Sequence, residues 1–167
     1  RVQLAAPPVI AAGRLFFLDS GHRVIAVDAN SGRRIWSEQI RSESRDRHAR
    51  GGGVAAAGGR VFVTTGYGAV VALDAATGDE VWRAEASAPF HSAPTVVGGR
   101  VYAITNDSEL IAFDAADGSL QWSHQAIAEP ARILSAPSVA IANESVIAPF
   151  ASGELVALLT ANGRRLW

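Results

Sequence analysis

A short phrase that ends in tryptophan occurs four times in this chain. The copies read VIAVDANSGRRIW, VVALDAATGDEVW, LIAFDAADGSLQW and LVALLTANGRRLW, and they end at Trp36, Trp82, Trp122 and Trp167. These are the only tryptophans among the 167 residues, and they are separated by 46, 40 and 45 residues. A period of this length is typical of repeated supersecondary units that stack on one another, so the repeat limits the fold more than any other feature does.

Other residues keep a constant distance from the tryptophan. A glycine stands four residues before every copy, at Gly32, Gly78, Gly118 and Gly163. An aspartate stands eight residues before the first three, at Asp28, Asp74 and Asp114, and Leu159 takes that place in the fourth. A glycine–arginine pair stands 22 residues before the first three, with its arginine at Arg14, Arg60 and Arg100. The chain therefore divides into four repeats, approximately 1–36, 37–82, 83–122 and 123–167.

Each repeat predicts four short β-strands. In the third repeat, SAPTVV and RVYAIT form the first two strands and ELIAF forms the third. The aspartate then caps the free amides of a turn that the glycine closes, and the fourth strand carries the tryptophan. Runs of apolar residues in the second and third strands indicate burial on both faces. We predict an all-β, partial β-propeller of four-stranded antiparallel blades, formed as a single domain by residues 1–167.

Composition and motif spacing favour a role without chemistry. The formal net charge is −1, which does not favour nucleic acid, and there is no cysteine for a disulfide, a thiolate metal site or a nucleophile. The four histidines show no spacing typical of a metal site. The repeated aspartates are interpreted as turn caps and the tryptophans as packing residues, because a catalytic residue would be unique to one copy. We predict no catalytic, metal or cofactor-binding residue.

Two connections between repeats are candidates for partner binding. The first, 37–50, is rich in charge and carries Arg41, Arg45, Arg47 and Arg50. The second, 123–137, places apolar residues beside charged ones, at Ile127, Glu129, Arg132, Ile133 and Leu134. Arginine beside exposed apolar side chains is common in protein interfaces, although a charged loop is often only solvated. Both connections join a fourth strand to the next first strand, so we expect them on the same face.

The phrase ALDAATGDEVW resembles the tryptophan-docking repeat of the quinoprotein-like, eight-bladed β-propellers. In that family the tryptophan of one blade packs into the next. The resemblance covers the whole chain and implies half of an eight-bladed ring. It leaves open a fragment of a PQQ-dependent dehydrogenase, or a ligand-sensing propeller ectodomain. An open half-ring would expose two apolar blade faces, so we also expect half-propellers to associate, for example into a closed ring.

A finer resemblance is to the BamB family of envelope lipoproteins. The stretches that carry it are RGGGVAAAGGRVFVTTGYGAVVALDAATG and IAEPARILSAPSVA. It implies a non-enzymatic accessory subunit of the outer-membrane β-barrel assembly (BAM) complex, anchored at the periplasmic face of the bacterial outer membrane. These residues contain no cysteine for the lipid anchor. The family binds the POTRA domains of BamA through inter-blade loops, and Arg132, Ile133 and Leu134 are the nearest match to its docking residues.

Overall fold

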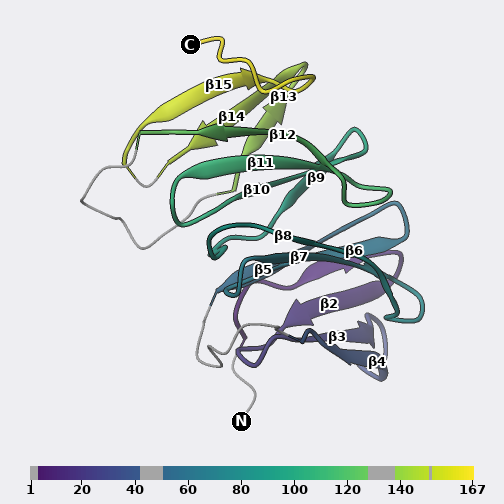
Figure 1. The fold of residues 1–167 in the computed structure, drawn as a ribbon. Coiled ribbons are helices and arrows are strands. Elements are labelled where there is room, and N and C mark those ends of the chain that lie inside the picture. The colour runs from purple at the N-terminus through teal and green to yellow at the C-terminus, as the bar shows by residue number, and fades with distance from the viewer. Residues whose placement is uncertain (1–3, 42–50, 128–137, 151) are drawn as a thin grey trace.

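A computed structural model describes residues 4–41, 51–127, 138–150 and 152–167. The described chain is all-β and forms four antiparallel sheets that follow one another from the N-terminus to the C-terminus (Figure 1). The two termini lie at opposite ends of this stack of blades. Within these ranges no helix has the length and apolar character needed to span a membrane. The predicted propeller fold is confirmed.

Neighbouring strands in each sheet are also consecutive in sequence. The first blade contains β1 (Val9–Ala11), β2 (Arg14–Leu18), β3 (Arg23–Asp28) and β4 (Arg34–Gln39). The second contains β5 (Gly52–Ala57), β6 (Arg60–Thr65), β7 (Ala69–Asp74) and β8 (Glu80–Glu85). The third contains β9 (Thr95–Val97), β10 (Arg100–Ile104), β11 (Glu109–Asp114) and β12 (Leu120–Gln125). The tryptophans that end the first three predicted repeats therefore lie inside the fourth strands.

The fourth blade differs from the predicted pattern of four strands. It contains β13 (Ala140–Ala142), β14 (Ser145–Pro149) and β15 (Leu155–Leu159). The expected fourth strand is represented by a single bridge between Leu158 and Arg165. Two backbone hydrogen bonds beside it join Ala157 to Leu166 and Trp167. After β15, the described residues therefore form one bridge and backbone hydrogen bonds to it but no fourth strand.

A β-bulge precedes each of the first three tryptophans. The pairing of β3 with β4 shifts between Ala26 and Val27, so that Trp36 faces Ala26 while Ile35 has no direct partner. The pairings of β7 with β8 and of β11 with β12 shift in the same way, leaving out Val81 and Gln121. A bulge re-aims the side chains that follow it. The tryptophan consequently turns out of its own sheet toward the next blade.

The hydrophobic core lies between the blades. One cluster joins the first and second blades, another joins the second and third, and another joins the third and fourth. Strands β6 and β7 are buried along almost their whole length, because each blade in the middle of the stack packs on both faces. First strands of neighbouring blades also meet, since β5 contacts both β1 and β9. There Gly53 is essential for packing: an added Cβ would lie 2.6 Å from Ala93 Cα.

Candidate functional site

Each of the first three tryptophans joins its blade to the following one. The indole N–H of Trp36 donates to the Ala75 carbonyl at 3.1 Å, and that of Trp82 donates to Ala115 at 3.0 Å. The indole of Trp122 makes the same bond to Thr160 at 2.9 Å. In each case the acceptor directly follows the aspartate position of the repeat. Successive blades are therefore held by one repeated contact.

The repeated arginine forms a second tie between blades. Arg14 donates to the Ala75 carbonyl at 3.3 Å, so this oxygen accepts from both Arg14 and Trp36. Arg60 donates through one terminal nitrogen to the carbonyls of Ala115 and Ala116, at 2.6 and 2.7 Å. The sequence showed the periodicity of these arginines but not their partners, which lie one blade away.

The repeated glycines provide the surface on which the indoles rest. A Cβ on Gly78 would lie 2.8 Å from the ring of Trp36, and one on Gly118 would lie 2.5 Å from Trp82. Gly163 stands in the same relation to Trp122, at 2.5 Å. Each of these three glycines also has a left-handed φ, between 71° and 84°. Both the turn and the close approach of the ring therefore require glycine at this position.

The repeated aspartates cap the turns that carry these glycines. Asp28 accepts hydrogen bonds from the backbone of Asn30 and Ser31, and Asp74 accepts from Ala76 and Thr77. Asp114 accepts from Ala116 at 2.7 Å. The backbone N–H of Ser31 and its hydroxyl hold the pKa of Asp28 below its usual value, and the Thr77 and Ala76 amides do the same for Asp74. These carboxylates therefore accept hydrogen bonds from the backbone amides of their own turns.

The two outermost positions of this repeated contact are open within the chain. A Cβ on Gly32 would meet no atom within 4 Å, whereas the other three glycines touch an indole. Trp167 is 59% exposed, whereas Trp82 and Trp122 are each 8% exposed. The turn at Gly32 in the first blade therefore contacts no indole, and the indole of Trp167 in the last blade contacts no glycine turn.

The ends of the blades opposite the aspartate turns carry the connections between blades. Of the residues proposed for partner binding, Arg41 is described: it is exposed, and its carbonyl accepts a hydrogen bond from Arg83 at 3.0 Å. Ile127, at the edge of the second connection, is 69% exposed. The other candidates lie outside the described residues: Arg45, Arg47, Arg50, Glu129, Arg132, Ile133 and Leu134.

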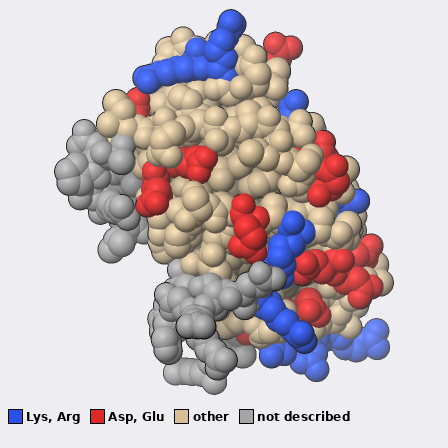
Figure 2. All heavy atoms as spheres, in the orientation of Figure 1, with Lys and Arg blue, Asp and Glu red and all other residues tan. Residues whose placement is uncertain are grey.

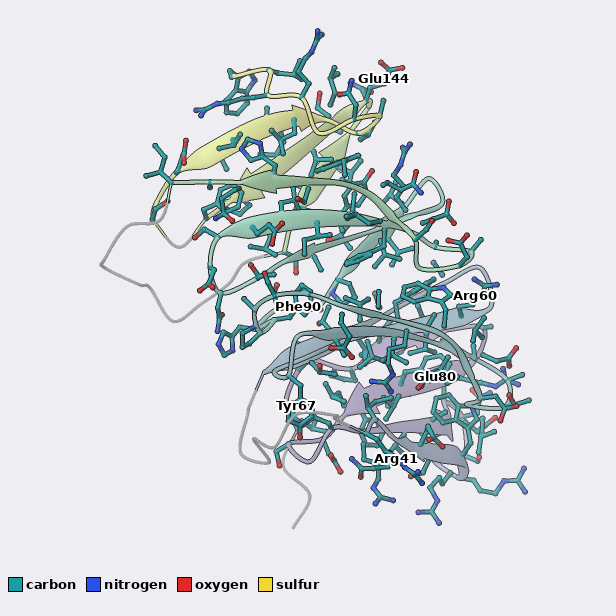
Figure 3. The ribbon with its side chains drawn as sticks, in the orientation of Figure 1. Arg41, Arg60, Tyr67, Glu80, Phe90 and Glu144 are labelled. Carbon is teal, nitrogen blue, oxygen red and sulfur yellow. The ribbon has the colours of Figure 1, made fainter. Side chains whose placement is uncertain are left out.

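The opposite ends of the second and third blades enclose a cleft of about 610 Å³. Arg60, labelled in Figure 3, lies at the hairpin that joins β5 to β6 and lines this cleft. Arg100, Asp114 and Gln121 of the third blade line it as well, over an apolar wall that includes Phe62 and Val96. The repeat pattern did not predict the cleft, because its lining residues belong to two different repeats.

Comparison with known proteins identifies both a family and a fold. The family model described as outer membrane protein assembly factor BamB matches residues 1–50 and 21–167, which together span the chain. No curated protein sequence matches it.

Several solved structures share the fold. BamB from Moraxella catarrhalis is 20% identical with a TM-score of 0.79, and the match covers 100% of this chain and 48% of that one. A quinohemoprotein alcohol dehydrogenase from Comamonas testosteroni is 21% identical with a TM-score of 0.76, covering 100% of this chain and 34% of that one. The computationally designed Ika8 protein is 14% identical with a TM-score of 0.73, covering 96% and 47%. The chain therefore spans about half of the BamB structure and a third of the dehydrogenase, and these identities show the fold alone.

Proposed function

Because the chain belongs to the outer membrane protein assembly factor BamB family, we propose that it is a non-catalytic scaffold in the assembly of outer-membrane β-barrel proteins. Its partner in this proposal is BamA, whose POTRA domains bind the connections between blades. The place of action is the periplasmic face of the outer membrane, where a lipid anchor outside these residues would hold the protein. The observation that carries the proposal is the family match along the whole chain.

The architecture supports a scaffold role. Tryptophan and glycine contacts join each blade to the next, so the described strands that flank the connections are held in place by the cores between the blades. In Figure 2 acidic and basic side chains lie beside one another mainly at the lower right, and most of this face is uncharged.

The second connection provides the test. We expect Arg132→Glu and Leu134→Asp each to weaken binding to purified BamA POTRA domains, because an interface arginine and a buried apolar anchor contribute most to such contacts. Surface plasmon resonance on immobilised POTRA domains would measure the affinities, and circular dichroism would check the fold. Arg33→Glu is the matched charge-reversal control, since Arg33 is exposed in the turn between β3 and β4, at the opposite ends of the strands. Unchanged affinity of both variants would contradict the proposal.

The similarity in fold to the alcohol dehydrogenase provides a second candidate, a fragment of a quinone-dependent dehydrogenase. Such an enzyme needs oxygen-rich ligands for its calcium ion. In the described ranges, no group of three or more histidine, cysteine, aspartate or glutamate side chains is arranged to hold a metal ion. We assign no chemical step to the described residues. Absorbance changes on adding pyrroloquinoline quinone with calcium would favour this candidate over the scaffold.

A further inference from the structure

A side chain that caps its own turn precedes each of the four repeated glycines. Ser31, Thr77, Asp117 and Asn162 stand five residues before the four tryptophans. Each accepts, through a side-chain oxygen, a hydrogen bond from the backbone N–H two residues further on, at 2.9–3.4 Å. The turn therefore requires a short side chain with an acceptor oxygen at this position, and hydroxyl, carboxylate and carboxamide groups all meet the requirement.

The fourth repeat fills this position with a side-chain amide. Asn162 is followed by Gly163, whereas the other three asparagines of the chain precede serine, aspartate and glutamate. An asparagine side chain condenses most readily with the next backbone nitrogen when that residue is glycine, because glycine has no Cβ to obstruct the ring that forms. Asn162 is exposed, so water reaches its side chain. The pair therefore has the chemistry needed for spontaneous deamidation.

The cap also places the reacting groups next to one another. The Oδ1 atom of Asn162 accepts the Arg164 N–H at 3.0 Å, so the carboxamide is folded back over the intervening Gly163 nitrogen. When that nitrogen attacks the carboxamide carbon, negative charge develops on Oδ1, where the Arg164 N–H stabilises it. The turn thus holds the nucleophile, the electrophile and a donor for the oxyanion within three consecutive residues.

One hydrogen bond opposes the reaction, and the strand pairing behind it is weaker in the fourth blade than in the third. The Gly163 N–H donates to the Leu159 carbonyl at 2.9 Å, and this proton must leave before the nitrogen can attack. Beyond this turn, the described residues pair with β15 through a single bridge and two backbone hydrogen bonds beside it. The equivalent turn at Gly118 is followed by β12, which pairs with β11 at five positions. Local opening of the turn therefore requires less free energy in the fourth blade.

We propose that Asn162 is a site of spontaneous deamidation. The Gly163 nitrogen bonds to the Asn162 carboxamide carbon, the bond from that carbon to Nδ2 breaks, and Nδ2 leaves as ammonia with the proton of the Gly163 N–H. Water then adds to either carbonyl of the resulting succinimide ring. Opening at the former side-chain carbonyl gives aspartate, and opening at the main-chain carbonyl gives isoaspartate. Neither step depends on the proposed scaffold function.

The two products differ in their effect on the joint between the third and fourth blades. Aspartate keeps the acceptor oxygen, and Asp117 shows that a carboxylate caps the same turn in the third repeat, at 2.9 Å. Isoaspartate carries the main chain through the side chain and inserts one extra carbon before Gly163. The indole of Trp122 leaves no room for this shift, since even a Cβ on Gly163 would lie 2.5 Å from its ring. We therefore expect isoaspartate, and not aspartate, to loosen the contacts of Trp122 with Gly163 and Thr160.

Incubation of the 167-residue chain in mildly alkaline buffer tests the site. Peptide mapping by mass spectrometry should place the mass gain of deamidation at Asn162, while the exposed Asn30 and Asn143 remain intact. Asn162→Ser should abolish the gain and keep the turn, because Ser31 caps the equivalent turn of the first repeat. The free peptide acetyl-Ala-Asn-Gly-Arg-amide provides the reference rate. No conversion at Asn162 under conditions that convert the peptide would overturn the proposal, as would equal conversion at Asn30.

Asp117→Asn is the matched control for the role of the fold, because it places the same Asn–Gly pair in the third-blade turn, before the fully paired β12. We expect Asn162 to react about tenfold faster than the substituted position, since one or two net backbone hydrogen bonds in the free energy of opening correspond to that factor. Equal rates in the two turns would overturn the assignment of the reaction to local opening of the fourth-blade turn.

The effect on the joint between blades has its own readout. Labelling with isoaspartyl methyltransferase would quantify isoaspartate in aged wild-type protein, and thermal unfolding would compare this sample with freshly prepared Asn162→Asp. We expect a fraction of the aged protein, in proportion to the label, to unfold at a lower temperature than the variant. A single transition at the temperature of Asn162→Asp, in protein that carries the label, would show that the added carbon leaves the Trp122 contact intact and would overturn this part of the proposal.

Discussion

His22 departs from its repeat. It stands at the same distance before the tryptophan as Gly68, Ser108 and Gly153, and all four have a left-handed φ. His22 has φ 59° and is only 2% exposed. Its ring lies 4.2 Å from that of Tyr67 in the next blade, and its Nε2 accepts the Gly66 amide at 3.4 Å. A bulky residue in this conformation is strained, and packing against the second blade stabilises it.

Burial lowers the pKa of His22 from its ordinary value, while Asp19 and the Gly51 backbone act in the opposite direction. Its Nδ1 is buried and has no hydrogen-bond partner within the described ranges. The unfolded chain therefore binds a proton more readily than the folded one does. The contribution of neutral His22 to the free energy of unfolding is therefore complete above the pKa of the unfolded chain, about 6.5. It is lost as the pH falls through the lower pKa of the folded state.

We expect His22→Ser to reduce this loss of stability in acid. Serine occurs at the same position in the third blade, at Ser108, so the turn tolerates it. Urea unfolding of both proteins, at about pH 7.5 and about pH 5, would measure the effect on the free energy of unfolding. His91→Ser, at an exposed histidine, is the control and should keep the wild-type dependence on pH. An equal acid destabilisation in wild type and His22→Ser would contradict the role given to His22.

At the scale of the secondary-structure elements, neighbouring blades are stabilised by the contact between the fourth strand of one blade and the aspartate turn of the next. Trp82 contributes its indole N–H to Ala115 and its ring to the face of Gly118. Within the blade, Phe62 lies behind the indole with its ring centre 5.9 Å away. Phe16 and Tyr102 lie behind Trp36 and Trp122 at the same separation. The sequence contained this signal as an aromatic residue two positions after each repeated arginine.

Two glycines allow this contact to be isolated. Gly118 and Gly32 have similar left-handed φ values of 76° and 69°, but only Gly118 touches an indole. Alanine at either position incurs the same backbone strain, of about 1–2 kcal/mol. We expect Gly118→Ala to cost about 1–3 kcal/mol more than Gly32→Ala, because its methyl group would overlap Trp82. Thermal and urea unfolding would give both values, and equal destabilisation would mean that the indole contact contributes nothing.

At the scale of the whole molecule, the stack of blades has two ends. The first blade exposes Ile10, which is 70% accessible, and the last exposes Leu155 and Trp167, at 51% and 59%. The backbone of the first aspartate turn matches the others: Ala29 donates to Gly13 at 2.9 Å, as Ala75 does to Gly59. The exposed indole at one end and the turn at the other are therefore complementary in the same way as neighbouring blades are.

For the 167-residue chain on its own, we expect association between copies rather than a stable monomer. The indole of Trp167 should contribute strongly to such an interface, because a buried tryptophan side chain removes about 150–250 Å² of surface from water. Sedimentation velocity would show a species larger than the monomer, and Trp167→Ala should shift it toward the monomer while thermal unfolding shows an intact fold. A monodisperse monomer of the wild-type chain would show that the end faces do not associate.

The sequence alone determined the fold class, the strand order within a blade and the residues of the repeated contact. Repetition makes this information visible, because tryptophan, glycine and aspartate must recur wherever the same turn and the same packing recur. It could not give the partners of Arg14 and Arg60, since each bond reaches a different repeat. Nor could it show that the fourth blade has a single bridge in place of a full fourth strand.

The tertiary structure alone decided which non-repeated residues act together. His22 and Tyr67 meet because the turn of one blade lies over the turn of the next. Arg60 and Asp114 line one cleft because it lies between the second and third blades. A periodic pattern specifies what every blade has in common, through local turn chemistry and burial. A site between blades depends on the distance and angle at which the finished sheets pack, and no single repeat encodes these.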